Sequence, residues 1–195
     1  MRAGSFGELS MRSVGLLGAA TALLFAVPAS ADVVSATSTT MEISQVLTID
    51  APIARVWDTL RSPQRWWSKE HTYSDDSANL YMDGQATGCF CERFPDRKGS
   101  VEHARILYIQ PPQMIRLSGA LGPLQAEAVV GTLTFKLAPE GSNATRLTLT
   151  YIVSGYVRAG ADTLAPKVDE VLATQVVNLK SAAEGPPPPA SAPTR

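Results

Sequence analysis

The strongest constraint on the fold is a pair of alternating segments followed by one long amphipathic segment. In 124–138 and 144–153, apolar residues occupy alternate positions, with Thr, Lys and Arg between several of them. A period of two predicts neighbouring strands of a sheet with one covered face and one wet face. The residues predicted to be covered are Leu133, Phe135, Leu137, Leu147, Leu149, Tyr151 and Val153.

The segment from Asp162 or Ala165 to about Ala183 can supply the cover that this sheet needs. Apolar residues recur there at helical spacing and form one stripe. At 1.5 Å per residue, such a helix is roughly 30 Å long, which is enough to cross a curved sheet. The stripe consists of Leu164, Val168, Val171, Leu172, Gln175, Val176 and Leu179.

The middle of the chain divides into short elements separated by turn residues. Pro52 is expected to open a short helix with apolar residues at helical spacing, and Ser62-Pro63 to end it. Separators such as Asp83-Gly84 favour short antiparallel connections between strands. Further strands are predicted at 41–49, 80–82, 88–94, 100–109 and 114–118.

The two ends of the chain differ from this central part. Residues 1–31 hold basic residues, the apolar run Val14–Val27 and the small-residue site Ala29-Ser30-Ala31, in the order of a secretory signal. The apolar run is about 14 residues, short of the roughly 20 needed to span a bilayer. We therefore expect cleavage near Ala31, a periplasmic or secreted protein, and no integral membrane segment in the mature chain, with Met11 as an alternative start.

Composition and the terminal segments also bound the domain organisation and the partners. We expect a linker at 32–40, one domain at 41–184 and a disordered tail in the Pro-rich 185–195. The net charge is −1 and no basic patch is present, which argues against nucleic acid as a partner. An apolar small molecule is the expected partner, and a protein partner stays open.

The order of elements and four short motifs resemble the helix-grip fold of the START/Bet v 1-like superfamily. Within it, the chain is similar to the branch of polyketide cyclases and activator-of-Hsp90-ATPase homologues. The motifs are Ala51 to Trp57, the Trp66-Trp67 pair, Gly88 to Glu92, and Pro111-Pro112 followed by Ile115 to Leu117.

The resemblance implies both a fold and a set of functions. The fold is of the α+β class, with a curved antiparallel sheet of about six to seven strands around a long C-terminal helix and a short helix after the first strand. The implied function is to bind a lipid or polyketide-like molecule in an internal cavity. A cavity-based cyclase or hydratase-type lyase and a protein-interaction module of the Hsp90-activator type are the alternatives.

Aromatic and apolar side chains are the candidate ligand contacts, because apolar pockets are lined by such residues with few polar groups. Large aromatic residues are equally compatible with a filled core, and His71 with an ordinary loop histidine. The candidates are Trp57, Trp66, Trp67, His71, Tyr81, Phe90, Leu117 and Phe135.

The only cysteines, Cys89 and Cys91, lie in a C-x-C pattern on a predicted strand. A regular strand places them about 6.6 Å apart, too far for a disulfide unless a bulge intervenes. If Phe94 lies opposite Ser100, Cys91 faces His103, and two thiols and one imidazole would form part of a zinc or copper site. Small buried thiols are the favoured interpretation, with a disulfide or a metal site as alternatives and no cofactor expected.

The candidate acid–base pair is His103 with Glu92 or Glu102, and Arg105 or Arg116 could hold an anion. Under the register above, both glutamates point away from His103. Cross-strand ion pairs on a wet hairpin are the alternative explanation for these charges. No nucleophile triad or phosphate-binding motif is present, so the sequence favours a binding protein over an enzyme.

Overall fold

The computed structural model describes Met1 and residues 30–186. Most of the predicted signal segment, the alternative start Met11 and residues 187–195 of the tail lie outside the described residues. The α-helices are α1 (Ile53–Leu60) and α2 (Ala161–Glu184), and four 3₁₀ turns are η1 (Pro63–Arg65), η2 (Lys69–His71), η3 (Ser77–Asn79) and η4 (Gly122–Ala126). The strands are β1 (Ser30–Ala36), β2 (Thr40–Ile49), β3 (Leu80–Met82), β4 (Cys89–Phe94), β5 (Gly99–Gln110), β6 (Met114–Ser118), β7 (Ala128–Glu140) and β8 (Ala144–Tyr156).

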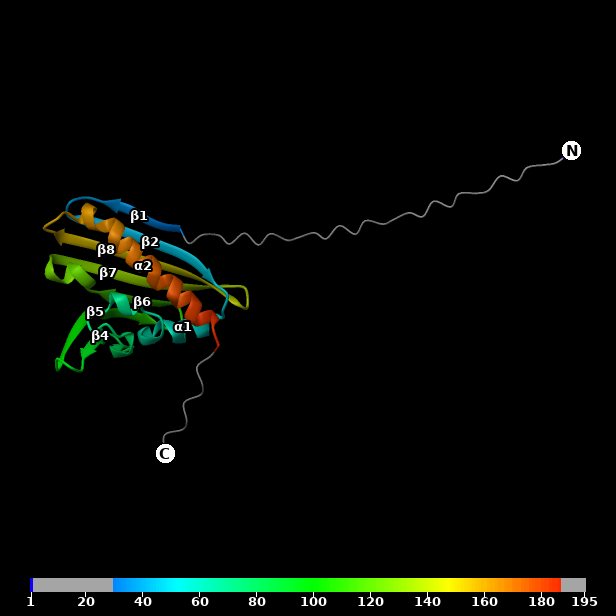
Figure 1. The fold of residues 1–195 in the computed structure, drawn as a ribbon, viewed down its shortest axis with the longest axis horizontal. Coiled ribbons are helices and arrows are strands. Elements are labelled where there is room, and N and C mark those ends of the chain that lie inside the picture. The colour runs from blue at the N-terminus through cyan, green and yellow to red at the C-terminus, as the bar shows by residue number, and fades with distance from the viewer. Residues whose placement is uncertain (2–29, 187–195) are drawn as a thin grey trace, which may run out of the picture.

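The strands form one antiparallel sheet in the order β1-β2-β8-β7-β6-β5-β4-β3 (Figure 1). With α1 after β2 and the long α2 at the end, this arrangement confirms the expected α+β helix-grip fold. The sheet has eight strands in the described part, more than the six to seven predicted. The additional strand is β1, since residues 30–36, expected to belong to the signal segment and the linker, pair with β2.

β1 was not predicted from the sequence because it is an edge strand without an alternating apolar pattern. Its valines Val33 and Val34 are both exposed, so no buried face marks the segment as a strand.

Neither α1 nor α2, the α-helices of the described residues, has the length and apolar character needed to span a bilayer.

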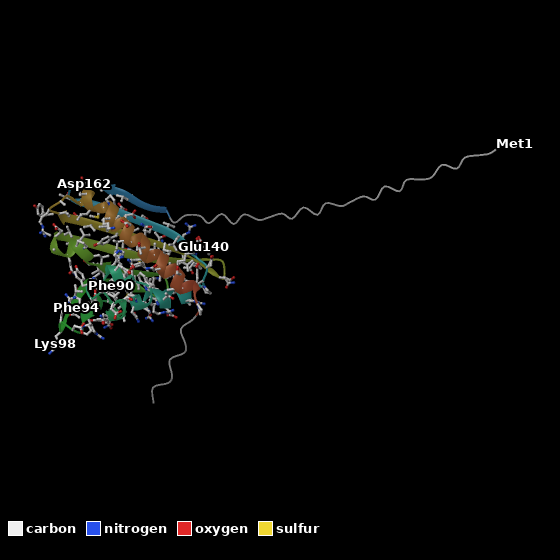
Figure 2. The ribbon with its side chains drawn as sticks, viewed as in Figure 1. Met1, Phe90, Phe94, Lys98, Glu140 and Asp162 are labelled. Carbon is white, nitrogen blue, oxygen red and sulfur yellow. A yellow bond between two sulfur atoms is a disulfide. The ribbon has the colours of Figure 1, made fainter. Side chains whose placement is uncertain are left out.

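The inner face of the sheet is the alternating face predicted for the last two long strands. Leu133 pairs with Tyr151, and Phe135 with Leu149, so these side chains meet on one side. All seven predicted inward residues are at most 2% exposed, which confirms that face as the core. In Figure 2, Phe90 lies toward the body of the molecule, whereas Lys98 lies at the tip of the β4–β5 hairpin.

Helix α2 lies across this face and contacts β1, β2 and α1 (Figure 1). It begins after Gly160, whose φ of +85° is a conformation that glycine adopts without strain. The C-terminal half of α2 is packed into the core through Leu172, Val176 and Leu179. In its N-terminal half, Ala161 and Ala165 are buried, whereas Leu164, Val168 and Val171 remain half-buried.

Candidate functional site

A cavity of about 430 Å³ lies beside the N-terminal half of α2. Its walls are α2, the loop 67–73 that contains η2, and the loop 121–124 that opens η4, and His103 of β5 completes it. Most of the lining is apolar and includes Trp67, Leu121, Leu124, Leu164, Val168 and Val171. The polar groups that reach it are few, as is typical of small-molecule sites.

Gln175 of α2 holds the first loop in place. Its side chain is fully buried; its Oε1 accepts a hydrogen bond from the Ser68 backbone N–H at 2.8 Å, and its Nε2 donates to His71 Nδ1 at 2.6 Å. The indole N–H of Trp67 donates to the His71 carbonyl at 3.0 Å. The side chain of Gln175 therefore fixes Trp67 and His71 at the cavity because it pairs with both ends of the η2 turn.

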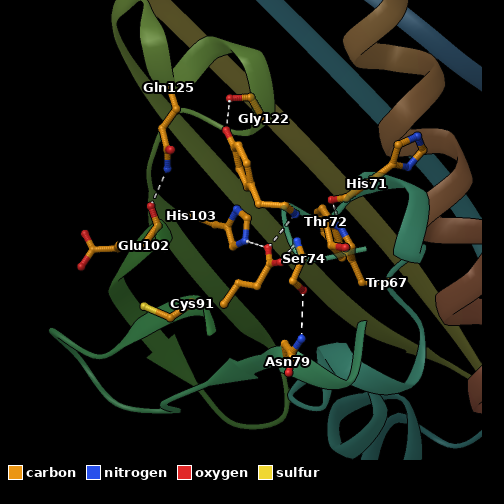
Figure 3. Close-up of polar contacts among 12 residues, drawn as sticks. Trp67, His71, Thr72, Ser74, Asn79, Cys91, Glu102, His103, Gly122 and Gln125 are labelled. Carbon is orange, nitrogen blue, oxygen red and sulfur yellow. Dashed lines mark hydrogen bonds and ion pairs between the residues drawn. The ribbon is translucent and has the colours of Figure 1, made fainter. Parts of the chain in front are cut away.

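Tyr151 of β8 holds the second loop. Its hydroxyl accepts from the Leu121 N–H at 3.1 Å and donates to the Gly119 carbonyl at 3.0 Å, and burial raises the pKa of Tyr151 to about 12. Tyr73 joins the two loops, since its hydroxyl donates to the Gly122 carbonyl at 2.9 Å (Figure 3). Both walls of the cavity are thus anchored to the sheet or helix beneath them.

Beside the cavity, Glu92 of β4 and His103 of β5 form a buried pair. His103 Nε2 lies 2.9 Å from Glu92 Oε2, and the two side chains are 5% and 0% exposed. Glu92 also accepts the backbone N–H groups of Tyr73, at 3.1 Å, and Ser74, at 2.6 Å. Figure 3 shows these contacts converging between the loop and β5. The carboxylate of Glu92 is thereby paired with three donors.

The environment sets the charges of this pair. Burial raises the pKa of Glu92, but the hydrogen bonds from Ser74, Tyr73 and His103 outweigh it and leave that pKa below its ordinary value. Burial lowers the pKa of His103 by more than the hydrogen bond and charge of Glu92 raise it. At neutral pH the pair is therefore a carboxylate that accepts a hydrogen bond from the N–H of a neutral imidazole.

The pairing of β4 with β5 differs from the predicted register. Phe94 lies opposite Gly99 instead of Ser100, and a shift between Phe90 and Cys91 leaves His103 without a direct partner on β4. β5 thus carries one extra residue, a β-bulge. The prediction that Cys91 faces His103 was wrong, because Cys91 lies opposite Glu102.

The structure contradicts the orientation predicted for Glu92 and agrees with the one predicted for Glu102. Glu92 points to the same side as His103 and is hydrogen-bonded to it. Glu102 points away from His103 (Figure 3) and forms an exposed ion pair with Arg105. Arg116 likewise lies exposed, with its Nε donating to Thr134 Oγ1 at 3.2 Å. Of the two glutamates considered, Glu92 is the one that the structure places beside His103.

Cys89 and Cys91 form a disulfide on the outer face of β4. Their Cα atoms are 5.5 Å apart, which is within the range that disulfides need and shorter than the spacing of about 6.6 Å expected for a regular strand. The preferred interpretation of two buried thiols was therefore wrong. The Cys–Cys–His metal site is not formed either, since both sulfurs are bonded to each other and face away from His103. In the described residues, no cluster of three or more His, Cys, Asp or Glu side chains could hold a metal ion.

Residues 40–184 match the sequence profile of a family described as polyketide cyclase / dehydrase and lipid transport. The chain belongs to this family. A comparison with curated proteins finds no match. This assignment agrees with the START/Bet v 1-like fold described above.

Solved structures similar to this polyketide cyclase/dehydrase and lipid-transport family member share its fold at low sequence identity. CalU16 from Micromonospora echinospora aligns with a TM-score of 0.56 and 18% identity over 84% of this chain and 88% of its own. A conserved protein of unknown function from Enterococcus faecalis, EF2215, gives 0.56 and 12% over 80% and 77%. A protein from Arthrobacter aurescens gives 0.51 and 19% over 80% and 94%.

In this family member, the structure brings together only some of the candidate ligand contacts. Trp67 and His71 line the cavity with His103, and Phe90 lies behind His103 with a ring-centroid distance of 4.9 Å. Tyr81 lies opposite Cys91 and outside the cavity, with the Arg93 guanidinium 4.6 Å from its ring centre. The remaining candidates fill the core instead: Trp57, Trp66, Leu117 and Phe135.

Several lining residues were not among the candidates. Tyr73 and the loop Leu121–Leu124 carried no periodic signal, so the sequence offered no reason to choose them. The residues Leu164, Val168 and Val171 were recognised as part of the helix stripe but not as cavity walls. An apolar stripe does not reveal which part of it is covered by the sheet.

Proposed function

We propose that this protein is exported and binds an apolar small molecule, lipid-like or polyketide-like, in the cavity between α2 and the two loops. The observation that carries the proposal is the cavity itself, about 430 Å³ with a mainly apolar lining. This volume falls within the range of roughly 300–1,000 Å³ found for small-molecule sites. The family description, which includes lipid transport, supports the same function.

Two observations support the export part of the proposal. Residues 1–31 have the order of a secretory signal. The disulfide Cys89–Cys91 is a bond that persists in oxidising compartments and is rare in the cytosol. The test is N-terminal sequencing of the protein recovered from the periplasm or medium of its own host. A mature chain that begins at Asp32 supports the proposal, whereas an intact N-terminus in the cytosolic fraction contradicts it.

Ligand binding is tested by titrating delipidated protein with an environment-sensitive apolar dye such as Nile red. The variant Val168→Trp fills the cavity, because Val168 lines it. The matched control is Val177→Trp on the same helix, where the side chain is 47% exposed and outside the cavity. We expect saturable binding that Val168→Trp removes and Val177→Trp preserves. Dye binding that is absent, or equal in both variants, contradicts the assignment of this cavity.

A second candidate function is a cyclase or hydratase-type lyase, and the Glu92–His103 pair is the observation that favours it. A carboxylate that orients a neutral histidine beside a cavity is a common arrangement for general-base catalysis. In such a reaction His103 would accept the proton from the substrate. Unchanged turnover of an identified substrate by His103→Ala would exclude this role.

A further inference from the structure

We propose that Glu92 and His103 form a proton-accepting subsite on the sheet side of the cavity, which takes an acidic hydroxyl of the ligand, such as a phenol or an enol. This inference rests on the proposed function, because it specifies the chemistry of the ligand in the same cavity. Three observations support it: Glu92 accepts three hydrogen bonds, aromatic rings surround His103, and the other polar side chains at the cavity already have partners.

The saturation of Glu92 fixes the tautomer of His103. The Oε1 atom of Glu92 accepts from the backbone N–H of Ser74, and its Oε2 atom accepts from the backbone N–H of Tyr73 and lies 2.9 Å from His103 Nε2. A carboxylate without a proton can only accept, so Nε2 must carry the hydrogen. In a neutral ring, the other nitrogen, Nδ1, then has a lone pair and no hydrogen.

The groups that surround the His103 ring leave the edge with this lone pair accessible to a ligand in the cavity. Tyr73 stacks on the ring at a centroid distance of 5.8 Å, Phe90 lies 4.9 Å away, and Glu92 occupies the Nε2 edge. His103 nevertheless lines the cavity, and in residues 30–186 no hydrogen bond reaches its Nδ1. The edge that carries Nδ1 is therefore the part of the ring that can meet a bound molecule.

The other polar side chains at the cavity already have partners. The His71 Nδ1 accepts from Gln175, Lys167 pairs with Glu170 at 2.8 Å, and Glu70 accepts from the Ser68 hydroxyl. His103 is thus the side chain of this set with an acceptor nitrogen left over. An apolar ligand that lacks a donor would cover this nitrogen and leave it without a hydrogen-bond partner, which costs affinity.

A ligand hydroxyl would satisfy the nitrogen in one of two ways. A weakly acidic hydroxyl donates a hydrogen bond to Nδ1. A more acidic one transfers its proton: the O–H bond breaks, the N–H bond forms, and the electron pair stays on the ligand oxygen. The resulting imidazolium is stabilised by the Glu92 carboxylate through the existing contact at 2.9 Å.

The test compares three probes of nearly equal shape: anthraquinone, 2-hydroxyanthraquinone and 2-methoxyanthraquinone. Dissociation constants are measured by quenching of tryptophan fluorescence, and the absorption spectrum reports whether the bound phenol has lost its proton. We expect the hydroxyl compound to bind about 5- to 20-fold more tightly than its methyl ether, the ratio that one buried hydrogen bond provides. His103→Gln should shift that ratio and the spectrum, whereas Glu102→Gln, on the outer face, should leave both unchanged.

A measurement without ligand guards against a variant that does not fold. The chain has two histidines, so ring ¹⁵N chemical shifts of the protein, assigned with His71→Gln, report the state of His103 directly. We expect a neutral ring with hydrogen on Nε2 at neutral pH. An imidazolium, or hydrogen on Nδ1, overturns the inference.

The outcomes also separate this inference from the proposed function. If all three probes bind with equal affinity, the cavity binds apolar molecules and the hydroxyl subsite is refuted. If none of them binds, the proposed function fails for molecules of this shape, and the subsite fails with it. A hydroxyl preference that persists in His103→Gln with an unchanged spectrum assigns the preference to another group and also refutes the inference.

Discussion

Replacing Glu92 by Gln would change the hydrogen bonds that join β4 to His103 of β5 and to the backbone of Tyr73 and Ser74. Glutamine keeps the size of the side chain but replaces one acceptor oxygen with an NH₂ group that can only donate. In the native protein, one oxygen of Glu92 accepts from Ser74 and the other from Tyr73 and His103. Both possible orientations of the amide therefore place its NH₂ against a backbone N–H.

The size of the effect follows from these contacts. If the amide oxygen takes the side of Tyr73, the N–H of Ser74 loses its acceptor; if the amide is flipped, His103 can change tautomer but the N–H of Tyr73 is left unpaired. One buried unpaired N–H costs about 1–3 kcal/mol, and replacing charged by neutral acceptors in the other two bonds costs about 1 kcal/mol each. We expect Glu92→Gln to lower the free energy of unfolding by about 3–5 kcal/mol, a large share of the roughly 5–15 kcal/mol of a typical domain.

The assay is urea unfolding at neutral pH, followed by tryptophan fluorescence. The control is Glu102→Gln on the same hairpin, where the side chain is 42% exposed and its ion pair with Arg105 faces solvent. Exposed pairs of this kind contribute about 0–1 kcal/mol, so the control should differ little from the native protein. If both variants lose the same small free energy, the hydrogen bonds around Glu92 do not stabilise the fold by several kcal/mol.

Three further predictions concern the surroundings of the cavity. Because the folded-state pKa of His103 lies below its ordinary 6.5, the unfolded chain binds a proton first on acidification. The free energy of unfolding should therefore decrease as the pH is lowered below about 6.5, and the variant His103→Gln should show a smaller decrease. Replacing Cys89 and Cys91 by Ser should cost about 1–2 kcal/mol in urea unfolding, because the closed loop is very short, and reductant should have no effect on that variant. Tyr151→Phe leaves two backbone groups of the cavity loop unpaired and should cost about 1–3 kcal/mol while weakening Nile red binding; unchanged stability and binding would show that another contact holds the loop.

The predictions from sequence were confirmed where the apolar residues of a single segment repeat with a regular period. The alternation in β7 and β8 and the stripe on α2 depend on side chains two, three or four residues apart, so they are readable along the chain. They were sufficient for the fold and for most of the core. The candidates Trp67 and His71 lie at the cavity, whereas the candidates Trp66 and Phe135 are core residues, and this difference depends on packing.

The candidate pair His103 and Glu92 illustrates the limit of such reading. Both residues were chosen, yet the assumed register placed them on opposite faces. A shift of one residue between two strands exchanges the faces of every side chain beyond it. The bulge at His103 produces such a shift, and no local pattern in 88–94 or 100–109 predicts it.

The amino-acid order of this chain specifies the elements and the faces that they bury, because periodicity is a local property of the polypeptide. The contact between Glu92 and His103 and the opening of the cavity beside the first half of α2 arise when distant segments pair. They depend on strand register and on how far the sheet reaches under the helix, and both are set by the packing of the whole domain.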